Sequence, residues 1–359
     1  MDEIVSEWQP HLRGYTVEWV DENGYILSRG CDLLSAVSLA RDSWSPMPFT
    51  EFPAGNLYRL GSRFRYTQRL LRLLFYNVLR LSHSRYLLTF GKDVATLQHG
   101  RLQRVGGLGR RARFLRGGIA IDGAGGAYFG EYLSNDRRGP ITIYYLPPHG
   151  TAVVAVYKFG SGAVRHVHGV YRDPFDGSFW CTTGDIKSEC AIWRSTDGFA
   201  TVEVVGRGDE TWRAVSLVFT ETAVLYGMDA EYCQNHLFRL DKRSGVREQL
   251  GAVDGPVYYS TTLGGDALFG VTAEGCPSQA INAASLWRVG GSGECMKLVS
   301  IRKDWLPKQF MPGTLHFSLG PGSLGHETYV YCHGLSRRDG HVLKVSCDSS
   351  TPSTLGARR

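Results

Sequence analysis

The sequence has no cysteine pair at the CxxC spacing of zinc sites, and none of its eight cysteines clusters with histidines at zinc-finger spacing. Its first residues, MDEIVSEWQPHLRGYTVEW, are acidic and have no apolar core, so they do not resemble a signal peptide. No segment approaches the roughly 18 uncharged apolar residues of a membrane span, since the best candidate, LLRLLFYNVLRL, contains Arg72 and Arg80. We therefore expect a cytoplasmic protein with free thiols and no membrane span, metal or cofactor.

Acidic residues are scarce in one part of the chain. Residues 59–116 contain 14 lysines and arginines but a single acid, Asp93, whereas the rest of the chain has more acidic than basic residues. A local excess of positive charge attracts an anionic partner, although an arginine-rich solvated face would have the same composition. We expect an acidic polysaccharide or oligosaccharide, because none of the motifs for nucleic-acid recognition is present.

A weak internal repeat runs along the chain, in which an apolar strand, a tight turn and an aromatic-rich strand are followed by an acid or a histidine. Seven such hairpins cover residues 15–32, 77–93, 116–131, 168–185, 213–229, 258–274 and 316–333. Further strand pairs lie between them, as in CAIWRSTDGFATVEVVG and NHLFRLDKRSGVREQLG, so each unit has four strands.

Four antiparallel strands in a repeat of roughly 40 to 60 residues are typical of a β-propeller blade. The sequence therefore predicts an all-β fold, a seven-bladed propeller that forms a single domain over residues 1–359, with a flexible tail at 347–359. Because residues 1–76 are the least regular, six blades with an N-terminal extension is the alternative.

The turn STDGFATV, Ser195 to Val202, resembles the Asp box of sialidase-like propellers, with the pattern Ser-x-Asp-x-Gly-x-Thr-aromatic. Phe199 stands where that family has glycine, and Val202 where it has an aromatic residue. In that family the box is a structural turn between the third and fourth strands of a blade. The resemblance therefore implies that this turn stabilises the fold, since an aspartate can accept hydrogen bonds from turn amides.

The innermost strand of each blade lines the channel of a propeller, and ligands bind at one mouth of it. Its predicted starting residues are Tyr15, Asn77, Arg116, His168, Arg213, Tyr258 and His316, and the hairpins end at Asp32, Asp93, Glu131, Asp185, Asp229, Glu274 and His333. Arg165, His166, Asn235 and His236 lie close to these positions in the sequence. We expect a polar site at the mouth of the channel, although strand-end acids also serve to satisfy backbone groups.

Such residues suit β-elimination at a uronate, which needs a cation for the carboxylate, a base for the adjacent C–H and an acid for the leaving oxygen. The arrangement resembles propeller polysaccharide lyases of the ulvan-lyase type, which use histidine, tyrosine and arginine around the channel of a seven-bladed ring. The resemblance implies catalysis by His166, His168, Tyr258 and Arg213. The predicted substrate-binding residues are Arg116, Glu131, Arg165, Asp185, Asp229, Asn235, His236 and His316.

Two other functions fit the same residues. Glu131, Asp185 and Asp229 offer the paired carboxylates of a sialidase-like glycoside hydrolase, and Arg116, Arg165 and Arg213 offer an arginine triad. A propeller without activity that binds a polyanion or a protein through the basic stretch is the third possibility.

Overall fold

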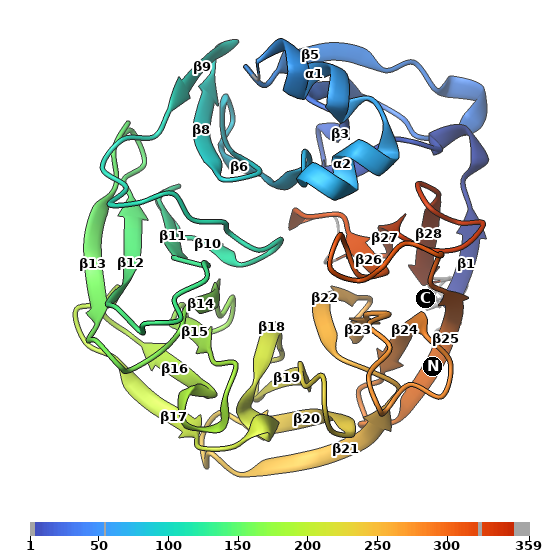
Figure 1. The fold of residues 1–359 in the computed structure, drawn as a ribbon. Helices are drawn as coiled ribbons and strands as arrows, with labels where there is room; N and C mark the ends of the chain where they lie inside the picture. The colour runs from blue at the N-terminus through green and yellow to red at the C-terminus, as the bar shows by residue number, and fades with distance from the viewer. Residues whose placement is uncertain (1–3, 54, 322–324, 348–359) are drawn as a thin grey trace, which may run out of the picture.

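The strands of this chain form seven antiparallel sheets of four strands each, arranged as blades around a central channel (Figure 1). The structure is a computed structural model, and it describes residues 4–53, 55–321 and 325–347. The prediction of a seven-bladed β-propeller is confirmed. The ring does not have six blades, because residues 16–51 form a blade of their own.

The first four blades follow the order of the chain. Blade 1 contains β2 (Thr16–Asp21), β3 (Gly24–Arg29), β4 (Asp32–Ala36) and β5 (Met47–Glu51). Blade 2 contains β6 (Phe75–Ser82), β7 (Arg85–Phe90), β8 (Asp93–Gln98) and β9 (Arg101–Arg104). Blade 3 contains β10 (Ile119–Ile121), β11 (Ala127–Gly130), β12 (Ile141–Leu146) and β13 (Val154–Phe159). Blade 4 contains β14 (Val167–Arg172), β15 (Phe179–Thr183), β16 (Ala191–Ser195) and β17 (Glu203–Arg207).

The last three blades complete the ring, and the final one uses the first strand of the chain. Blade 5 contains β18 (Ala214–Phe219), β19 (Ala223–Met228), β20 (Asn235–Asp241) and β21 (Arg247–Val253). Blade 6 contains β22 (Val257–Leu263), β23 (Asp266–Val271), β24 (Ala283–Val289) and β25 (Cys295–Arg302). Blade 7 contains β26 (Thr314–Phe317), β27 (Glu327–His333), β28 (Val342–Cys347) and β1 (Ile4–Trp8). Short 3-10 helices lie at Pro10–Leu12, Arg41–Ser43, Lys187–Glu189 and Glu210–Trp212.

The outermost strand of a blade is the most exposed one, and the strands inside it are largely buried. Every residue of β19, the second strand of blade 5, is buried, since both of its faces pack on neighbouring blades. The outermost strand β17 of blade 4 has no buried residue. Large polar side chains at the ends of the inner strands are therefore exceptions to a hydrophobic pattern.

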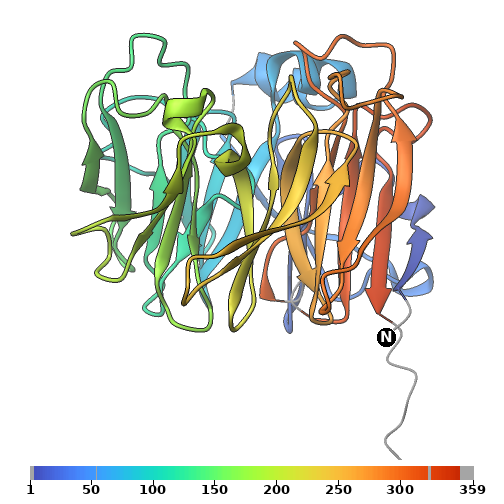
Figure 2. The same cartoon turned by 90° about the horizontal axis from the view of Figure 1, so that it is seen from below.

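The ring closes through β1, which pairs with β28 from Ile4↔Cys347 to Trp8↔Leu343. β1 begins, at Ile4, on the face of the ring opposite the two α-helices (Figure 2). Of the predicted flexible tail at 347–359, only Cys347 is within the described residues, as the last residue of β28, and the remainder lies outside them.

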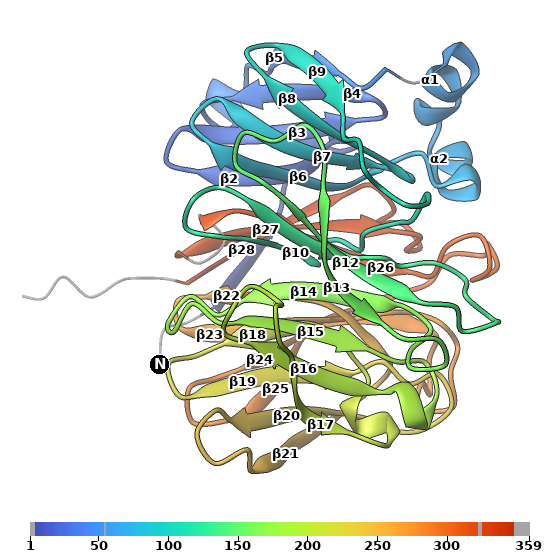
Figure 3. The same ribbon diagram turned by 90° about the vertical axis from the view of Figure 1, so that its left-hand side faces the viewer.

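Two short helices, α1 (Asn56–Ser62) and α2 (Arg65–Leu71), connect blades 1 and 2 and stand on the other face of the ring (Figure 3). Arg69 of α2 is 1% exposed and forms an ion pair with Asp304, and Arg65 pairs with Asp339 at 2.7 Å. These contacts hold α2 against the segment after β25 and the turn between β27 and β28. Among the described residues no helix has both the length and the apolar character needed to cross a membrane.

The STDGFATV turn joins β16 and β17, which is the position expected for it. Asp197 accepts hydrogen bonds from the Ser195 hydroxyl at 2.9 Å and from the amide of Thr201 at 2.9 Å. Phe199 has a φ of 70° and a fully buried ring that packs near Tyr128 and Phe179. The aromatic residue at the glycine position thus adds to the core at the cost of a left-handed backbone.

Candidate functional site

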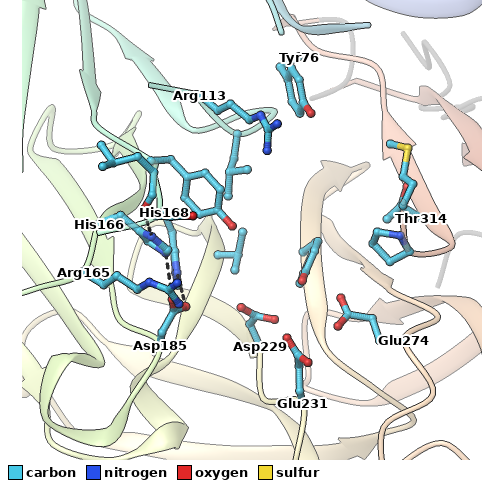
Figure 4. Close-up of a pocket in the computed structure, with 18 of the residues that line it drawn as sticks. Tyr76, Arg113, Arg165, His166, His168, Asp185, Asp229, Glu231, Glu274 and Thr314 are labelled. Carbon is cyan, nitrogen blue, oxygen red and sulfur yellow. Dashed lines mark hydrogen bonds and ion pairs between the residues drawn. The ribbon is translucent and has the colours of Figure 1, made fainter. Parts of the chain in front are cut away.

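A cavity of about 820 Å³ lies at one mouth of the channel (Figure 4). Arg72, the residue directly after α2, is part of its lining. In every blade the first strand begins where the antiparallel second strand ends, so the two termini lie together at the same mouth. The amide of Asp229, which follows β19, donates to the carbonyl of Arg213, which precedes β18, at 2.9 Å. This geometry explains why residues far apart in the sequence share one cavity.

Eight of the twelve residues predicted to act in catalysis or substrate binding line this cavity. They are Arg165, His166, His168, Asp185, Arg213, Asp229, Tyr258 and His316. They come from the four consecutive blades 4 to 7, as the hairpin register predicts.

Two charged residues predicted to bind substrate do not line this cavity. Arg116 is 5% exposed, forms an ion pair with Glu18 and donates to the carbonyl of Phe317 at 2.7 Å. Glu131 is 2% exposed and pairs with Arg110 at 2.7 Å. Both side chains are directed into the protein, where they join neighbouring segments.

Asn235 and His236 also lie away from the cavity lining. Asn235 is fully buried, accepts from the amide of Ala230 at 2.9 Å and donates to the same residue's carbonyl at 2.7 Å, which closes the loop before β20. His236 is half-buried in the third strand of blade 5, two strands away from the channel. Their sequence proximity to Asp229 does not bring them to the mouth.

Several residues that line the cavity do not stand at the start or the end of a predicted hairpin. Arg113 and Tyr132 are backbone partners through two hydrogen bonds of 3.0 and 3.2 Å, and both line the cavity with Arg72 and Lys92. The Nε atom of Arg113 is buried and has no hydrogen-bond partner among the described residues. The only sequence signal for these cations is the basic stretch, whose composition does not say which arginines face the channel.

Asp185 is the centre of a compact cluster on one wall of the cavity. Its carboxylate binds Arg165 at 2.7 Å and Arg213 at 3.3 Å, and it faces Nε2 of His166 at 3.5 Å and Nε2 of His168 at 3.6 Å. Burial opposes its ionisation, but the pKa of Asp185 is held well below its usual range, with two guanidinium groups in contact with its carboxylate. Asp185 is therefore a carboxylate at neutral pH.

On the neighbouring wall of the cavity, two acids have raised rather than lowered pKa values. Asp229 is 3% exposed, and burial raises its pKa well above the usual value, although Arg213 lies 3.2 Å away. Burial also raises the pKa of Glu274, and burial together with the charges of Asp229 and Glu274 raises the pKa of Tyr258. Tyr258 is consequently a phenol at neutral pH and is able to donate a proton.

His166, His168 and Asp185 are the group within the described part of the chain that could hold a metal ion. One donor atom from each lies within 4.8 Å of the other two. From the sequence we expected no metal, since the cysteines and histidines show no ligand spacing. The structure shows a possible ligand cluster that this spacing did not predict, because the carboxylate of Asp185 follows the neighbouring strand β15.

The fold is shared with solved structures of several functions, whereas no family model and no curated protein sequence matches the chain. An oligogalacturonate lyase from Vibrio parahaemolyticus has a TM-score of 0.60 at 9% identity, over 96% of this chain and 98% of that one. An oligogalacturonate lyase in complex with manganese has a TM-score of 0.58 at 10% identity, over 97% and 91%. The extracellular domain of BT4673 from B. thetaiotaomicron has a TM-score of 0.53 at 12% identity, over 92% of this chain but 40% of that one.

At these identities the comparisons establish the propeller fold and no particular activity. They supply no evidence for the sialidase-like Asp-box family, so that resemblance rests on the turn at Ser195–Val202 alone. The chain spans only two fifths of the BT4673 structure, in which the propeller is part of a larger chain. Function must therefore be argued from the cavity.

Two buried histidines beside the cavity should make the fold sensitive to acid. His316 and His333 have ring centroids 4.5 Å apart, and burial lowers the pKa of His333 from 6.5 to about 3 and that of His316 well below 6.5. Because the unfolded chain binds these protons more tightly, their contribution to stability is present above pH 6.5 and is lost as the pH falls toward 3. We expect the free energy of unfolding to fall by about 1.4 kcal/mol per pH unit for each ring in this window.

Urea unfolding at neutral pH and at about pH 5 measures this effect, with His333→Gln as the comparison. The variant should lose less stability on acidification than the wild type. Equal losses in the two proteins would contradict the assignment.

Proposed function

We propose that this propeller binds an acidic, uronate-containing glycan in the cavity at the channel mouth and cleaves it by β-elimination. The observation that carries the proposal is a group of three cations, Arg72, Lys92 and Arg113, that line the cavity and form no ion pair among the described residues. Seven cationic and four acidic side chains line the cavity in total. An excess of cations in a concave, partly buried site favours a polyanionic ligand.

The cations of the basic stretch, residues 59–116, differ in whether they form ion pairs. Arg59, Arg80 and Arg110 pair with acids elsewhere in the ring, whereas Arg72 and Arg113 remain available to a ligand. The unpaired charge of the stretch is therefore partly directed into the cavity. This distribution supports an anionic substrate over a solvated arginine-rich face.

β-Elimination needs three groups, and the cavity contains each. The C–H bond next to the substrate carboxylate breaks, a C=C bond forms, the bond to the glycosidic oxygen breaks, and that oxygen takes a proton. A cation at the carboxylate stabilises the enolate that develops at the first step. A base accepts the carbon-bound proton, and an acid protonates the leaving oxygen.

We assign the cation to Arg113 because Arg213 is already shared between Asp185 at 3.3 Å and Asp229 at 3.2 Å. Arg213 is then a positioning residue. Tyr258 is the acid, since it remains a phenol at neutral pH.

Asp229 is the base in this assignment. Its Oδ1 is buried without a hydrogen-bond partner among the described residues, and its raised pKa makes its carboxylate more basic than an exposed one. His168 is less suited to this role, because its Nδ1 contacts the carbonyl of Ala214 at 2.8 Å and its Nε2 faces Asp185.

Glycoside hydrolysis is the second candidate, and one observation favours it. Asp185 and Asp229 both contact Arg213, yet their surroundings move their pKa values in opposite directions. Two nearby carboxyl groups whose pKa values differ in this way are typical of an acid paired with a base or nucleophile.

Product analysis on acidic polysaccharides, oligogalacturonate among them, distinguishes the candidates. A lyase produces an unsaturated uronate that absorbs in the ultraviolet together with new reducing ends. A hydrolase produces reducing ends without that absorbance. Binding without either product would leave a polyanion-binding propeller and contradict both enzymatic proposals.

Replacing Arg113 by alanine should weaken binding of an acidic oligosaccharide by about tenfold to a hundredfold, the range of a lost charge-assisted hydrogen bond. Arg101→Ala is the matched control, since it removes one charge from the same basic stretch at an exposed position of β9. Titration calorimetry at low and high salt measures both, and affinity should fall as salt rises. Equal losses in the two variants would show that net charge, rather than the Arg113 contact, drives binding.

A further inference from the structure

The two histidines on the cavity wall have the same tautomer, which their backbone contacts determine. Nδ1 of His166 lies 3.0 Å from the carbonyl of Leu133, and Nδ1 of His168 lies 2.8 Å from the carbonyl of Ala214. A carbonyl oxygen only accepts hydrogen bonds, so each Nδ1 carries the proton. In the neutral rings each Nε2 therefore presents a lone pair.

Both lone pairs converge on a third acceptor. The Nε2 atoms lie 3.5 and 3.6 Å from different oxygens of Asp185, and all three donor atoms lie within 4.8 Å of one another. His166 Nε2 is buried and has no hydrogen-bond partner among the described residues. Three lone pairs held at one point in a buried wall repel each other unless a positive charge lies between them.

One metal ion bound by all three groups would supply that charge. The histidine side chains are 5% and 2% exposed, their ring centroids are 5.0 Å apart, and Arg165 and Arg213 lie beside Asp185. A single ion bound by all three groups removes the lone-pair repulsion directly.

Arg165 and Arg213 do not prevent metal binding at Asp185, because each of them also contacts a second acid. Arg165 also binds Asp136 at 3.0 Å, and Arg213 also contacts Asp229 at 3.2 Å. Arg165 in addition fixes the orientation of the Asp185 carboxylate. Outer contacts that orient ligands, together with histidines that donate their other N–H to a carbonyl, are typical of metal sites.

We propose that His166, His168 and Asp185 bind one divalent transition-metal ion in the wall of the cavity. Two imidazoles and one carboxylate favour ions such as Zn²⁺, Mn²⁺, Co²⁺ or Ni²⁺ over Ca²⁺ and Mg²⁺, which prefer oxygen ligands. Three protein ligands leave coordination positions open toward the cavity, where an anionic oxygen of a ligand can bind. The metal site does not depend on the reaction proposed above.

Metal binding to the full chain tests this directly. The protein is treated with a chelator, dialysed, and titrated by calorimetry with Zn²⁺, Mn²⁺, Co²⁺ and Ni²⁺ separately, and the bound metal is then counted by elemental analysis. We expect one ion per chain and a rise in Tm on binding. If the untreated wild type and all four titrations give no stoichiometric metal, the proposal is overturned.

Variants locate the ion. His166→Ala and Asp185→Asn should each weaken metal affinity by more than the roughly 10-fold to 100-fold typical of losing an outer contact. His236→Ala removes a histidine outside the cavity and should bind metal as the wild type does. Circular dichroism without metal checks folding, and the wild-type titration decides the proposal if a variant does not fold.

If His166→Ala and Asp185→Asn are folded and bind metal as tightly as the wild type, the site is elsewhere and the proposal fails. The visible spectrum of bound Co²⁺ gives an independent readout, since loss of an imidazole ligand changes its bands. A protein that binds metal as proposed but cleaves no acidic glycan would refute the proposed lyase and leave the metal site standing.

Discussion

Tyr258→Phe should lower the turnover of an acidic glycan by about 10² to 10⁴, the usual contribution of one positioned proton-transfer group. The phenol lines the cavity, and its pKa is raised by burial and by the charges of Asp229 and Glu274. Phenylalanine keeps the ring and removes only the hydroxyl group. Substrate affinity should therefore change much less than turnover, and the ultraviolet absorbance of the unsaturated product measures the loss.

Tyr76→Phe is the matched comparison for this experiment. Tyr76 also lines the cavity, but its buried hydroxyl has no hydrogen-bond partner among the described residues, and it lies across the cavity from Asp229 and Glu274 (Figure 4). Its loss should be clearly smaller than that at Tyr258. Similar losses in the two variants would mean that the cavity tyrosines shape the site without transferring the proton.

Arg116→Met should destabilise the ring by about 3 to 5 kcal/mol, the usual cost of leaving one buried charge without its partner. The side chains of Arg116 and Glu18 are 2% and 1% exposed, and Arg116 also donates to the carbonyl of Phe317. The pair joins the segment before blade 3 to blades 1 and 7 near the ring centre. Urea unfolding monitored by circular dichroism gives the change in free energy.

The double variant Glu18→Gln, Arg116→Met separates an unpaired charge from a loss of packing. It should recover part of the stability, because no buried carboxylate then remains without a cation. If Arg116→Met keeps full stability and instead loses affinity for acidic glycans, the substrate-binding role predicted from the sequence is right and the structural role is wrong.

The arrangement of the fold was largely predictable because a propeller repeats one local pattern. Each hairpin runs from the start of an inner strand to the end of the second strand, and this register identified His168, Arg213 and Tyr258 as neighbours in the cavity. The strand pairs expected between the hairpins are the third and fourth strands of blades 4 and 5. Local periodicity is the strongest structural signal in a single sequence.

The site was only partly predictable because side-chain partners lie in other blades. Arg116 has the expected register, but its partner Glu18 is 98 residues away and draws the guanidinium into the ring. Arg113 is neither the first nor the last residue of a predicted hairpin, since it lies in the segment before β10. The carbonyls that set the tautomers of the two histidines belong to Leu133 and Ala214, on the blades at either side.

The pairing of β1 with β28 affects the order in which the molecule can be completed. Ile4 precedes its partner Cys347 by 343 residues, so β1 has no partner strand in the ring until β28 has been synthesised. Before that point β1 has an unpaired edge that can associate with other chains. Contacts of such large sequence separation form slowly, because a long loop must close first. Ring closure is consequently the step at which a nascent or partly unfolded chain is most exposed to aggregation.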